Sequence, residues 1–188
     1  MALGPCNMTP VVKHSLILVL GGARSGKSRY AEHLASKSGR PVTYVATAGP
    51  PRDAEMTARI AAHQARRPEH WTTVEVATDL AEAVAGLRSV VLVDCLTLWL
   101  TNVLLAERDL EAEVDALVAA LGTRSGAIIA VSNEVGEGIV PANALGRRFR
   151  DLQGMLNQRV AASATDVVKV VAGCAVIIKP RNEPEPQL

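Results

Sequence analysis

The eight residues from Gly21 to Ser28 have the residue types and spacing of a loop that binds the phosphates of a nucleotide. They match the pattern GxxxxGK followed by Ser or Thr, and they stand between an apolar run and a helical pattern. In such a loop the backbone N–H groups turn towards a phosphate, the lysine reaches the β- and γ-phosphates, and the serine holds Mg²⁺. A glycine-rich turn without a ligand is the alternative. The residues of the predicted nucleotide site are Gly21, Gly22, Ala23, Arg24, Ser25, Gly26, Lys27 and Ser28. Lys27 is the predicted catalytic residue among them, and Ser28 is a predicted Mg²⁺ ligand.

Asp94 follows four aliphatic residues, 90–93, whose pattern is typical of a buried strand. A carboxylate at the carboxyl end of such a strand corresponds to the Walker B position, where it binds Mg²⁺ directly or through water. Aspartate is also a favoured N-cap, so a helix that begins at Leu96 would give Asp94 a structural role. We predict that Asp94 is a metal ligand, and the capping role stays open.

His63 is three residues after Ile60 and seven after Met56, so the three side chains share one face of a predicted helix. An imidazole nitrogen can attack phosphorus and form a P–N bond. Positive charge on Arg59, Arg66 and Arg67 could neutralise a triphosphate and keep the imidazole unprotonated. The alternatives are a packing or surface histidine and a solvated arginine face.

The elements that would position these residues alternate along the chain. Five apolar runs are typical of strands buried on both faces of a parallel sheet, namely residues 16–20, 42–46, 90–93, 128–131 and 167–171. Helical patterns separate them, at roughly 26–38, 53–66, 78–86, 107–122 and 143–164. This alternation predicts an α/β fold of the P-loop NTPase type, with a mostly parallel sheet flanked by helices. Gly173, between two apolar runs, indicates a closing hairpin at the C-terminal end.

A chain of 188 residues can form one domain with a sizeable core. We expect this domain over residues 15–179, a loose extension over 1–14 and a tail over 180–188. The net charge of +1 argues against general attraction to nucleic acid or anionic lipid, and no apolar run reaches transmembrane length. Cys6, Cys95 and Cys174 are too far apart to suggest a zinc site or a disulfide framework. We therefore expect a cytoplasmic protein that binds phosphates locally.

A phosphate loop alone leaves kinases, GTPases and ATPases open, and the Asn-Lys-x-Asp signature of regulatory GTPases is missing from the sequence. Further segments narrow the choice. They are Tyr44-Val45-Ala46-Thr47; Arg59-Ile60 with His63, Arg67-Pro68 and Trp71; Ser132-Asn133-Glu134-Val135-Gly136 with Gly138-Ile139-Val140-Pro141; and Asn157-Gln158-Arg159. Together with the phosphate loop, this set resembles the bifunctional adenosylcobinamide kinase/adenosylcobinamide-phosphate guanylyltransferase family over about residues 16–179.

The resemblance implies two reactions. ATP or GTP phosphorylates the aminopropanol hydroxyl of adenosylcobinamide, and GTP then transfers GMP to adenosylcobinamide phosphate, which yields adenosylcobinamide-GDP and pyrophosphate. It also implies a phosphoramidate on His63 and a homo-oligomer. The other positions that match nucleotide contacts of the family are Ala46, Thr47, Ala48, Gln64, Ala65, Arg66, Arg67, Glu75 and Asp94.

Two departures from the family pattern are local. Ala62 stands where relatives can carry a second histidine, and residues 49–52 form a proline-rich loop. The alternative functions are a kinase for another small alcohol or nucleoside, with a structural His63, and a nucleotide-gated binding module without transfer chemistry. Asn133 and Glu134 end an apolar run where α/β proteins place ligands, so we expect a substrate-site loop there. Asn157 and Arg159 are ligand contacts or polar positions of a long helix.

Overall fold

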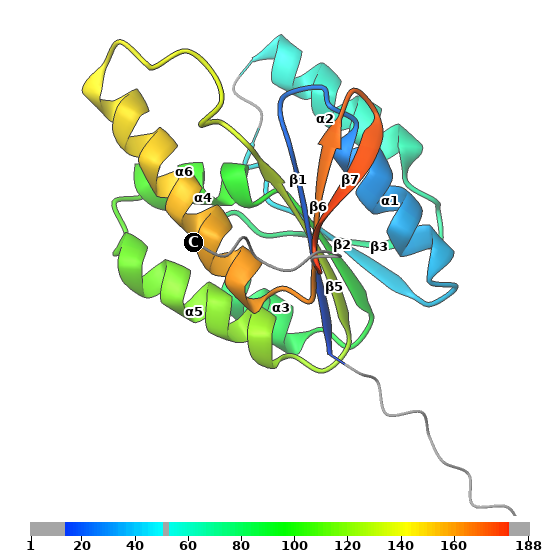
Figure 1. The fold of residues 1–188 in the computed structure, drawn as a ribbon. Coiled ribbons are helices and arrows are strands. Elements are labelled where there is room, and N and C mark those ends of the chain that lie inside the picture. The colour runs from blue at the N-terminus through cyan, green and yellow to red at the C-terminus, as the bar shows by residue number, and fades with distance from the viewer. Residues whose placement is uncertain (1–13, 51–52, 181–188) are drawn as a thin grey trace, which may run out of the picture.

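The computed structural model describes residues 14–50 and 53–180, and it shows a seven-stranded sheet with helices on both faces (Figure 1). The elements in chain order are β1 (Ser15–Gly21), α1 (Lys27–Lys37), β2 (Val42–Ala46), α2 (Ala54–Arg66), β3 (Thr72–Glu75), α3 (Leu80–Gly86), β4 (Val90–Asp94), α4 (Leu96–Leu105), α5 (Leu110–Thr123), β5 (Ala127–Asn133), α6 (Ala144–Ser163), β6 (Asp166–Val171) and β7 (Cys174–Lys179). The strand order is β3-β2-β4-β5-β1-β6-β7. The predicted α/β fold with a mostly parallel sheet is confirmed. The proposed extension lies outside the described residues except for His14, as does the proposed tail except for Pro180.

The sheet is covered on one face by α1 and α2 and on the other by α3, α4, α5 and α6 (Figure 1). Successive residues of a strand point to opposite faces, and β1 shows this alternation. Leu16 and Leu18 pack with α3 to α6, whereas Val19 packs with α1. Because both faces are covered, the central strands are aliphatic at nearly every position, which explains the continuous apolar runs of the sequence.

The predicted alternation of strands and helices lacks two elements, although a helix beginning at Leu96 was considered as an alternative for Asp94. β3 is an edge strand whose residues are mostly exposed, so it lacks the apolar run of the central strands. α4 is apolar around most of its circumference, and Trp99, Leu100 and Val103 are buried. A helix of this kind has no polar face, so it lacks the 3.6-residue period by which the other helices were predicted.

The C-terminal hairpin predicted around Gly173 is confirmed. β7 pairs antiparallel with β6, and Ala172 and Gly173 turn the chain with φ angles of 50° and 81°. The turn packs against the phosphate loop, because the Gly173 N–H donates a hydrogen bond of 2.8 Å to the Ser25 carbonyl oxygen. The turn between β6 and β7 therefore supports the phosphate loop.

Candidate active site

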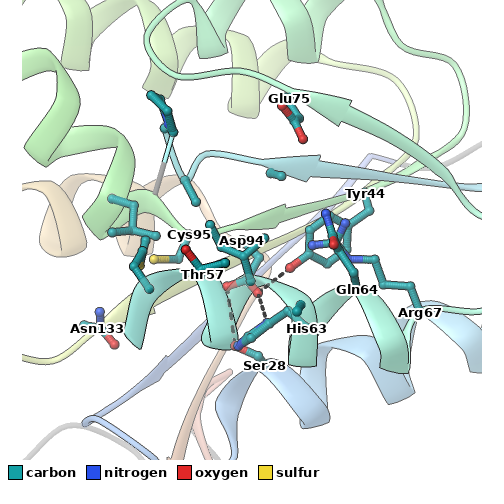
Figure 2. Close-up of a pocket in the computed structure, with 18 of the residues that line it drawn as sticks. Ser28, Tyr44, Thr57, His63, Gln64, Arg67, Glu75, Asp94, Cys95 and Asn133 are labelled. Carbon is teal, nitrogen blue, oxygen red and sulfur yellow. Dashed lines mark hydrogen bonds and ion pairs between the residues drawn. The ribbon is translucent and has the colours of Figure 1, made fainter. Parts of the chain in front are cut away.

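The carboxyl ends of six parallel strands form one edge of the sheet, and the predicted functional residues lie along it. Ala46 pairs with both Glu75 and Asp94, and Gly21 pairs with Asn133. This edge and α2 enclose a pocket of about 420 Å³ (Figure 2). Side chains from α1, β2, α2, β3, β4, α4 and β5 line it. The fold thus gathers into one cavity residues that are more than 100 positions apart in the sequence.

The phosphate loop requires glycine at two of its positions, and its lysine folds back on the loop. A Cβ atom on Gly21 would lie 2.4 Å from the Ser25 Oγ and 2.7 Å from the Val170 carbonyl oxygen, so only glycine fits there. Gly26 has a φ of 96°, a conformation that side chains disfavour. The Lys27 Nζ donates a hydrogen bond of 3.1 Å to the Gly22 carbonyl oxygen, which folds the lysine over the loop. The two glycines and the Lys27 hydrogen bond thus fix the shape of the loop, and Lys27 and Ser28 at its end line the pocket.

Asp94 accepts contacts from three side chains (Figure 2). Its Oδ1 lies 3.4 Å from the Ser28 Oγ. Its Oδ2 lies 2.6 Å from the Tyr44 hydroxyl and 3.3 Å from the His63 Nδ1. The two oxygens thus have different partners: one faces the phosphate loop, and the other faces α2 and β2.

Burial acts to raise the pKa of the Asp94 carboxyl, but hydrogen bonds from His63 and Tyr44 and the charges of His63 and Lys27 outweigh it and hold the pKa below its usual value. Burial is also the main reason that the pKa of Tyr44 is raised, with the Asp94 carboxylate adding to the effect. Tyr44 is therefore a neutral hydrogen-bond donor and Asp94 an ionised acceptor at neutral pH.

The capping alternative for Asp94 is wrong. The N-cap of α4 is Cys95, and its side chain makes no capping hydrogen bond. The side chain of Thr47 binds the backbone at this turn. Its Oγ1 donates a hydrogen bond to the Cys95 carbonyl oxygen and accepts one from the Cys95 N–H, each at 2.7 Å. Because Thr47 is fully buried, it supports the turn after β4 and does not face the pocket.

His63 lies near the end of α2, and it lines the pocket together with Met56 and Ile60 from the same helix face. The Asp53 side chain starts this helix by accepting a hydrogen bond of 2.7 Å from the Met56 N–H. Asp94 holds the ring of His63. Because a quarter of the side chain is exposed, the ring is also open to a ligand. The face that a sequence pattern would assign to packing therefore faces a cavity.

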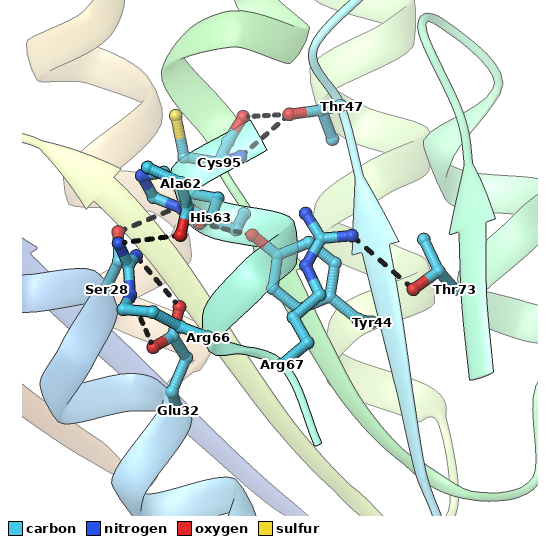
Figure 3. Close-up of polar contacts among 11 residues, drawn as sticks. Ser28, Glu32, Tyr44, Thr47, Ala62, His63, Arg66, Arg67, Thr73 and Cys95 are labelled. Carbon is cyan, nitrogen blue, oxygen red and sulfur yellow. Dashed lines mark hydrogen bonds and ion pairs between the residues drawn. The ribbon is translucent and has the colours of Figure 1, made fainter. Parts of the chain in front are cut away.

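The arginines around His63 have partners of their own (Figure 3). Arg66 donates to both oxygens of Glu32 at 3.3 and 3.2 Å, and Arg67 stacks on the Tyr44 ring with its Cζ 3.6 Å from the ring centroid. The Arg59 side chain lies outside the described residues. Arg67 nevertheless lines the pocket together with His63, and the charged group in contact with the imidazole is the Asp94 carboxylate.

The predicted nucleotide contacts divide into two groups. Those that line the pocket are Lys27, Ser28, Ala46, Ala48, His63, Gln64, Arg67, Glu75 and Asp94. Those that do not are Gly21, Gly22, Ala23, Arg24, Ser25, Gly26, Thr47, Ala65 and Arg66. Asn133, which the sequence placed in a substrate-site loop, also lines the pocket. Tyr44 also lines the pocket, and the sequence does not predict this role, since a tyrosine within an apolar strand shows no sign that its hydroxyl meets a carboxylate.

Ser28 and Asp94 suit Mg²⁺. Both offer oxygen atoms, and the two oxygens lie side by side. Mg²⁺ prefers oxygen ligands and keeps several waters or substrate phosphates, so two protein ligands are enough. No group of three or more His, Cys, Asp or Glu residues that could hold a metal occurs within residues 14–50 and 53–180. The site therefore fits a metal shared with nucleotide phosphates better than a metal enclosed by protein.

The parallel sheet, the phosphate loop and the Walker B carboxylate define a nucleotide-binding protein of the P-loop class. Solved structures agree on the fold. The flagellar accessory protein FlaH from Methanocaldococcus jannaschii matches with a TM-score of 0.52 and 16% identity, covering 90% of this chain and 80% of that one. An ATPase from a bacterial type III secretion system matches with a TM-score of 0.51 and 12% identity, covering 83% and 51%.

The chain belongs to the cobinamide kinase / cobinamide phosphate guanyltransferase family, whose pattern matches residues 17–178. The bifunctional adenosylcobalamin biosynthesis protein CobP of Pseudomonas aeruginosa is 51% identical over 169 residues, covering 86% of this chain and 96% of that protein. The protein named CobU of Escherichia coli is 43% identical, and that of Salmonella typhimurium is 42% identical; each match covers 87% of this chain and 99% of the relative. Within the described part of the chain, no helix combines the length and the apolar character needed to cross a membrane.

Proposed function

We propose that this chain phosphorylates adenosylcobinamide with ATP or GTP and then transfers GMP from GTP to adenosylcobinamide phosphate, with His63 as the guanylyl carrier. The observation that carries this proposal is the contact of His63 with Asp94, which brings an imidazole to the carboxylate that also meets Ser28 of the phosphate loop. A kinase without a covalent intermediate does not need a histidine at this position. In this proposal the phosphate loop and Asp94 serve both the kinase and the guanylyl-transfer reaction, whereas His63 serves only guanylyl transfer.

The position of Asp94 suits His63 for nucleophilic attack. Because Nδ1 donates to the Asp94 carboxylate, the lone pair of the ring is on Nε2. In the proposed step Nε2 forms a bond to the α-phosphorus of GTP, the bond from that phosphorus to the α,β-bridging oxygen breaks, and pyrophosphate leaves with the electron pair. A phosphate oxygen of the acceptor then bonds to the same phosphorus, and the P–N bond breaks. Asp94 stabilises the positive charge that develops on the ring.

The phosphate loop serves both reactions in this proposal. Lys27 contacts the phosphates, and Ser28 and Asp94 would hold Mg²⁺, which neutralises phosphate charge when it is bound. In the kinase reaction, the acceptor hydroxyl oxygen bonds to the γ-phosphorus. The bond from that phosphorus to the β,γ-bridging oxygen breaks, the nucleoside diphosphate leaves with the electron pair, and the hydroxyl proton passes to solvent.

The proposed function is tested by labelling the protein with GTP that carries ³²P at the α- or the γ-phosphorus. In the presence of Mg²⁺, the α-label should become bound to the protein through a bond that is labile in acid and stable in alkali, as phosphoramidates are. The γ-label should not. Adenosylcobinamide phosphate should then remove the α-label as adenosylcobinamide-GDP. A protein that transfers the γ-label to adenosylcobinamide but never acquires the α-label is instead a kinase without a covalent intermediate.

Glu75 is proposed to select guanine. It lines the pocket at the end of β3, and a carboxylate can accept hydrogen bonds from both N1–H and the 2-amino group of guanine, donors that adenine lacks. We expect Glu75→Ala to reduce the preference for GTP over ATP in adduct formation by about tenfold or more, because hydrogen bonds to a charged group are lost. The measurement is the labelling rate with each α-labelled nucleotide. Glu69→Ala, an exposed glutamate outside the pocket, is the matched control, and an unchanged preference in Glu75→Ala would contradict the assignment.

A homo-oligomer is also proposed, and β7 supports it. This strand is the edge of the sheet, and the side chains of Val176, Ile177 and Ile178 are 53%, 63% and 44% exposed. An apolar edge strand of this kind favours contact with another chain. We expect light scattering during size-exclusion chromatography to give a mass that is a multiple of the chain mass, and Ile177→Lys to lower it. A monomer at micromolar concentration would contradict the proposal.

A further inference from the structure

Asn133, at the carboxyl end of β5, is among the pocket residues to which the reactions proposed above give no role. The geometry points to Asn133 as a further catalytic residue, whose carboxamide contacts the γ-phosphoryl group of the bound nucleotide. This inference rests on the proposed function. It follows from the face on which the side chain lies, from the way its backbone is held, and from its place along the edge of the sheet.

The alternation of β5 directs Asn133 into the pocket. Ile129 and Val131 pack with α1, so Asn133, two residues further on, shares their face. Ser132 faces the other way, where its hydroxyl donates to the Asn157 Oδ1 at 2.6 Å. The face of Asn133 is also that of Tyr44 and the phosphate loop, and Figure 2 shows Asn133 at one side of the cavity.

The backbone of Asn133 is held by side chains from two helices on the opposite face. The Thr97 Oγ1 accepts a hydrogen bond of 2.9 Å from the Asn133 N–H, and the Asn157 Nδ2 donates one of 3.0 Å to the Asn133 carbonyl oxygen. The next residue is held as well, because the Glu134 N–H donates to the carbonyl oxygen of Gly21, the first residue of the phosphate loop. Asn133 is thus fixed relative to the loop, while its carboxamide makes no hydrogen bond within the described part of the chain.

The order of groups along the sheet edge assigns the γ-phosphate to Asn133. Glu75 ends β3, Asp94 with its partner His63 ends β4, and Asn133 ends β5, next to β1 and the phosphate loop. If Glu75 reads guanine and His63 attacks the α-phosphorus, the triphosphate continues towards Asn133. A carboxamide N–H can donate to the γ-phosphoryl oxygens as the bond to the acceptor hydroxyl forms and the bond to the β,γ-bridging oxygen breaks. It adds no charge, so the electrostatics at the α-phosphorus are unaffected.

The test compares binding of the α,β-methylene analogues of GTP and GDP, which differ only by the γ-phosphate and cannot guanylylate His63. Calorimetry with the full chain and Mg²⁺ gives the ratio of the two dissociation constants. We expect Asn133→Ala to weaken the triphosphate analogue about tenfold and to leave the diphosphate analogue almost unchanged, because one hydrogen bond to a charged group is lost. The kinase rate should fall at least as much, whereas labelling of the protein by α-labelled GTP should change much less.

Thr97 provides a second variant that does not touch the nucleotide. Thr97→Val keeps the shape but removes the acceptor for the Asn133 N–H, so it should reduce the affinity ratio in part, and Thr97→Ser should restore it. Asn143→Ala is the matched control: Asn143 caps α6 by accepting a hydrogen bond from the Gly146 N–H and does not line the pocket, so its loss should lower stability without changing the ratio. An unchanged ratio and kinase rate in Asn133→Ala would overturn the assignment. A wild-type protein without kinase activity would contradict the proposed function, whereas the affinity ratio would still decide the contact of Asn133.

Discussion

His63→Ala is expected to abolish guanylyl transfer and to leave the phosphorylation of adenosylcobinamide close to its wild-type rate. The imidazole is the group that would carry GMP, and the rate of adenosylcobinamide-GDP formation should fall at least about a thousandfold, as expected when a covalent nucleophile is lost. The kinase reaction moves the γ-phosphoryl directly to a hydroxyl and needs no adduct. Labelling with α-labelled GTP measures the first reaction, and transfer of γ-label to adenosylcobinamide measures the second.

His33→Ala is the matched control for this prediction, because His33 is an exposed histidine on α1 that does not line the pocket. It should retain both activities. Circular dichroism of His63→Ala must show the wild-type helix content, since a collapsed α2 would remove more than the imidazole. If the folded variant still forms the adduct, another residue carries GMP and the assignment of His63 is wrong.

Asp94→Asn is expected to reduce both reactions, in contrast to His63→Ala. Asp94 is the ionised acceptor for Tyr44 and His63, and together with Ser28 it would hold Mg²⁺. Asparagine keeps the shape but loses the charge, so we expect the kinase and the guanylyltransferase rates each to fall about a hundredfold and the Mg²⁺ concentration for half-maximal rate to rise. Rates measured across a Mg²⁺ titration give both quantities.

Lys27→Ala should resemble Asp94→Asn in lowering both reactions, but it should act mainly by weakening GTP binding, since the ammonium would contact the phosphates.

Asp79→Asn is the matched control for Asp94→Asn, because Asp79 is exposed and its partner is Arg108 at the surface. Such a pair contributes little to stability, and neither residue lines the pocket. If Asp94→Asn lowers stability while both rates and the Mg²⁺ dependence stay at wild-type values, Asp94 is structural.

Local patterns in the sequence were sufficient for most of the fold. The phosphate loop was predictable because the local backbone requires its glycines: Gly26 has a positive φ, and Gly21 leaves no space for a side chain beside Ser25. The five central strands were predictable because burial on both faces requires aliphatic residues at nearly every position. The exposed edge strand β3 and the buried helix α4 were not predictable, since each lacks the contrast between apolar and polar positions on which a pattern depends.

Only the tertiary structure decided which polar groups meet. Asp94 is 50 residues from Tyr44 and 31 from His63, and its partners follow from the order of β2 and β4 in the sheet and from the position of α2 above them. The position of the Asn133 backbone depends likewise on Thr97 and Asn157, which come from helices on the other face. The sequence by itself determined that the chain has a phosphate loop, a carboxylate after a buried strand and a histidine on a helix. Their convergence in one pocket is a result of strand order, because contacts between residues distant in sequence leave no periodic signal in it.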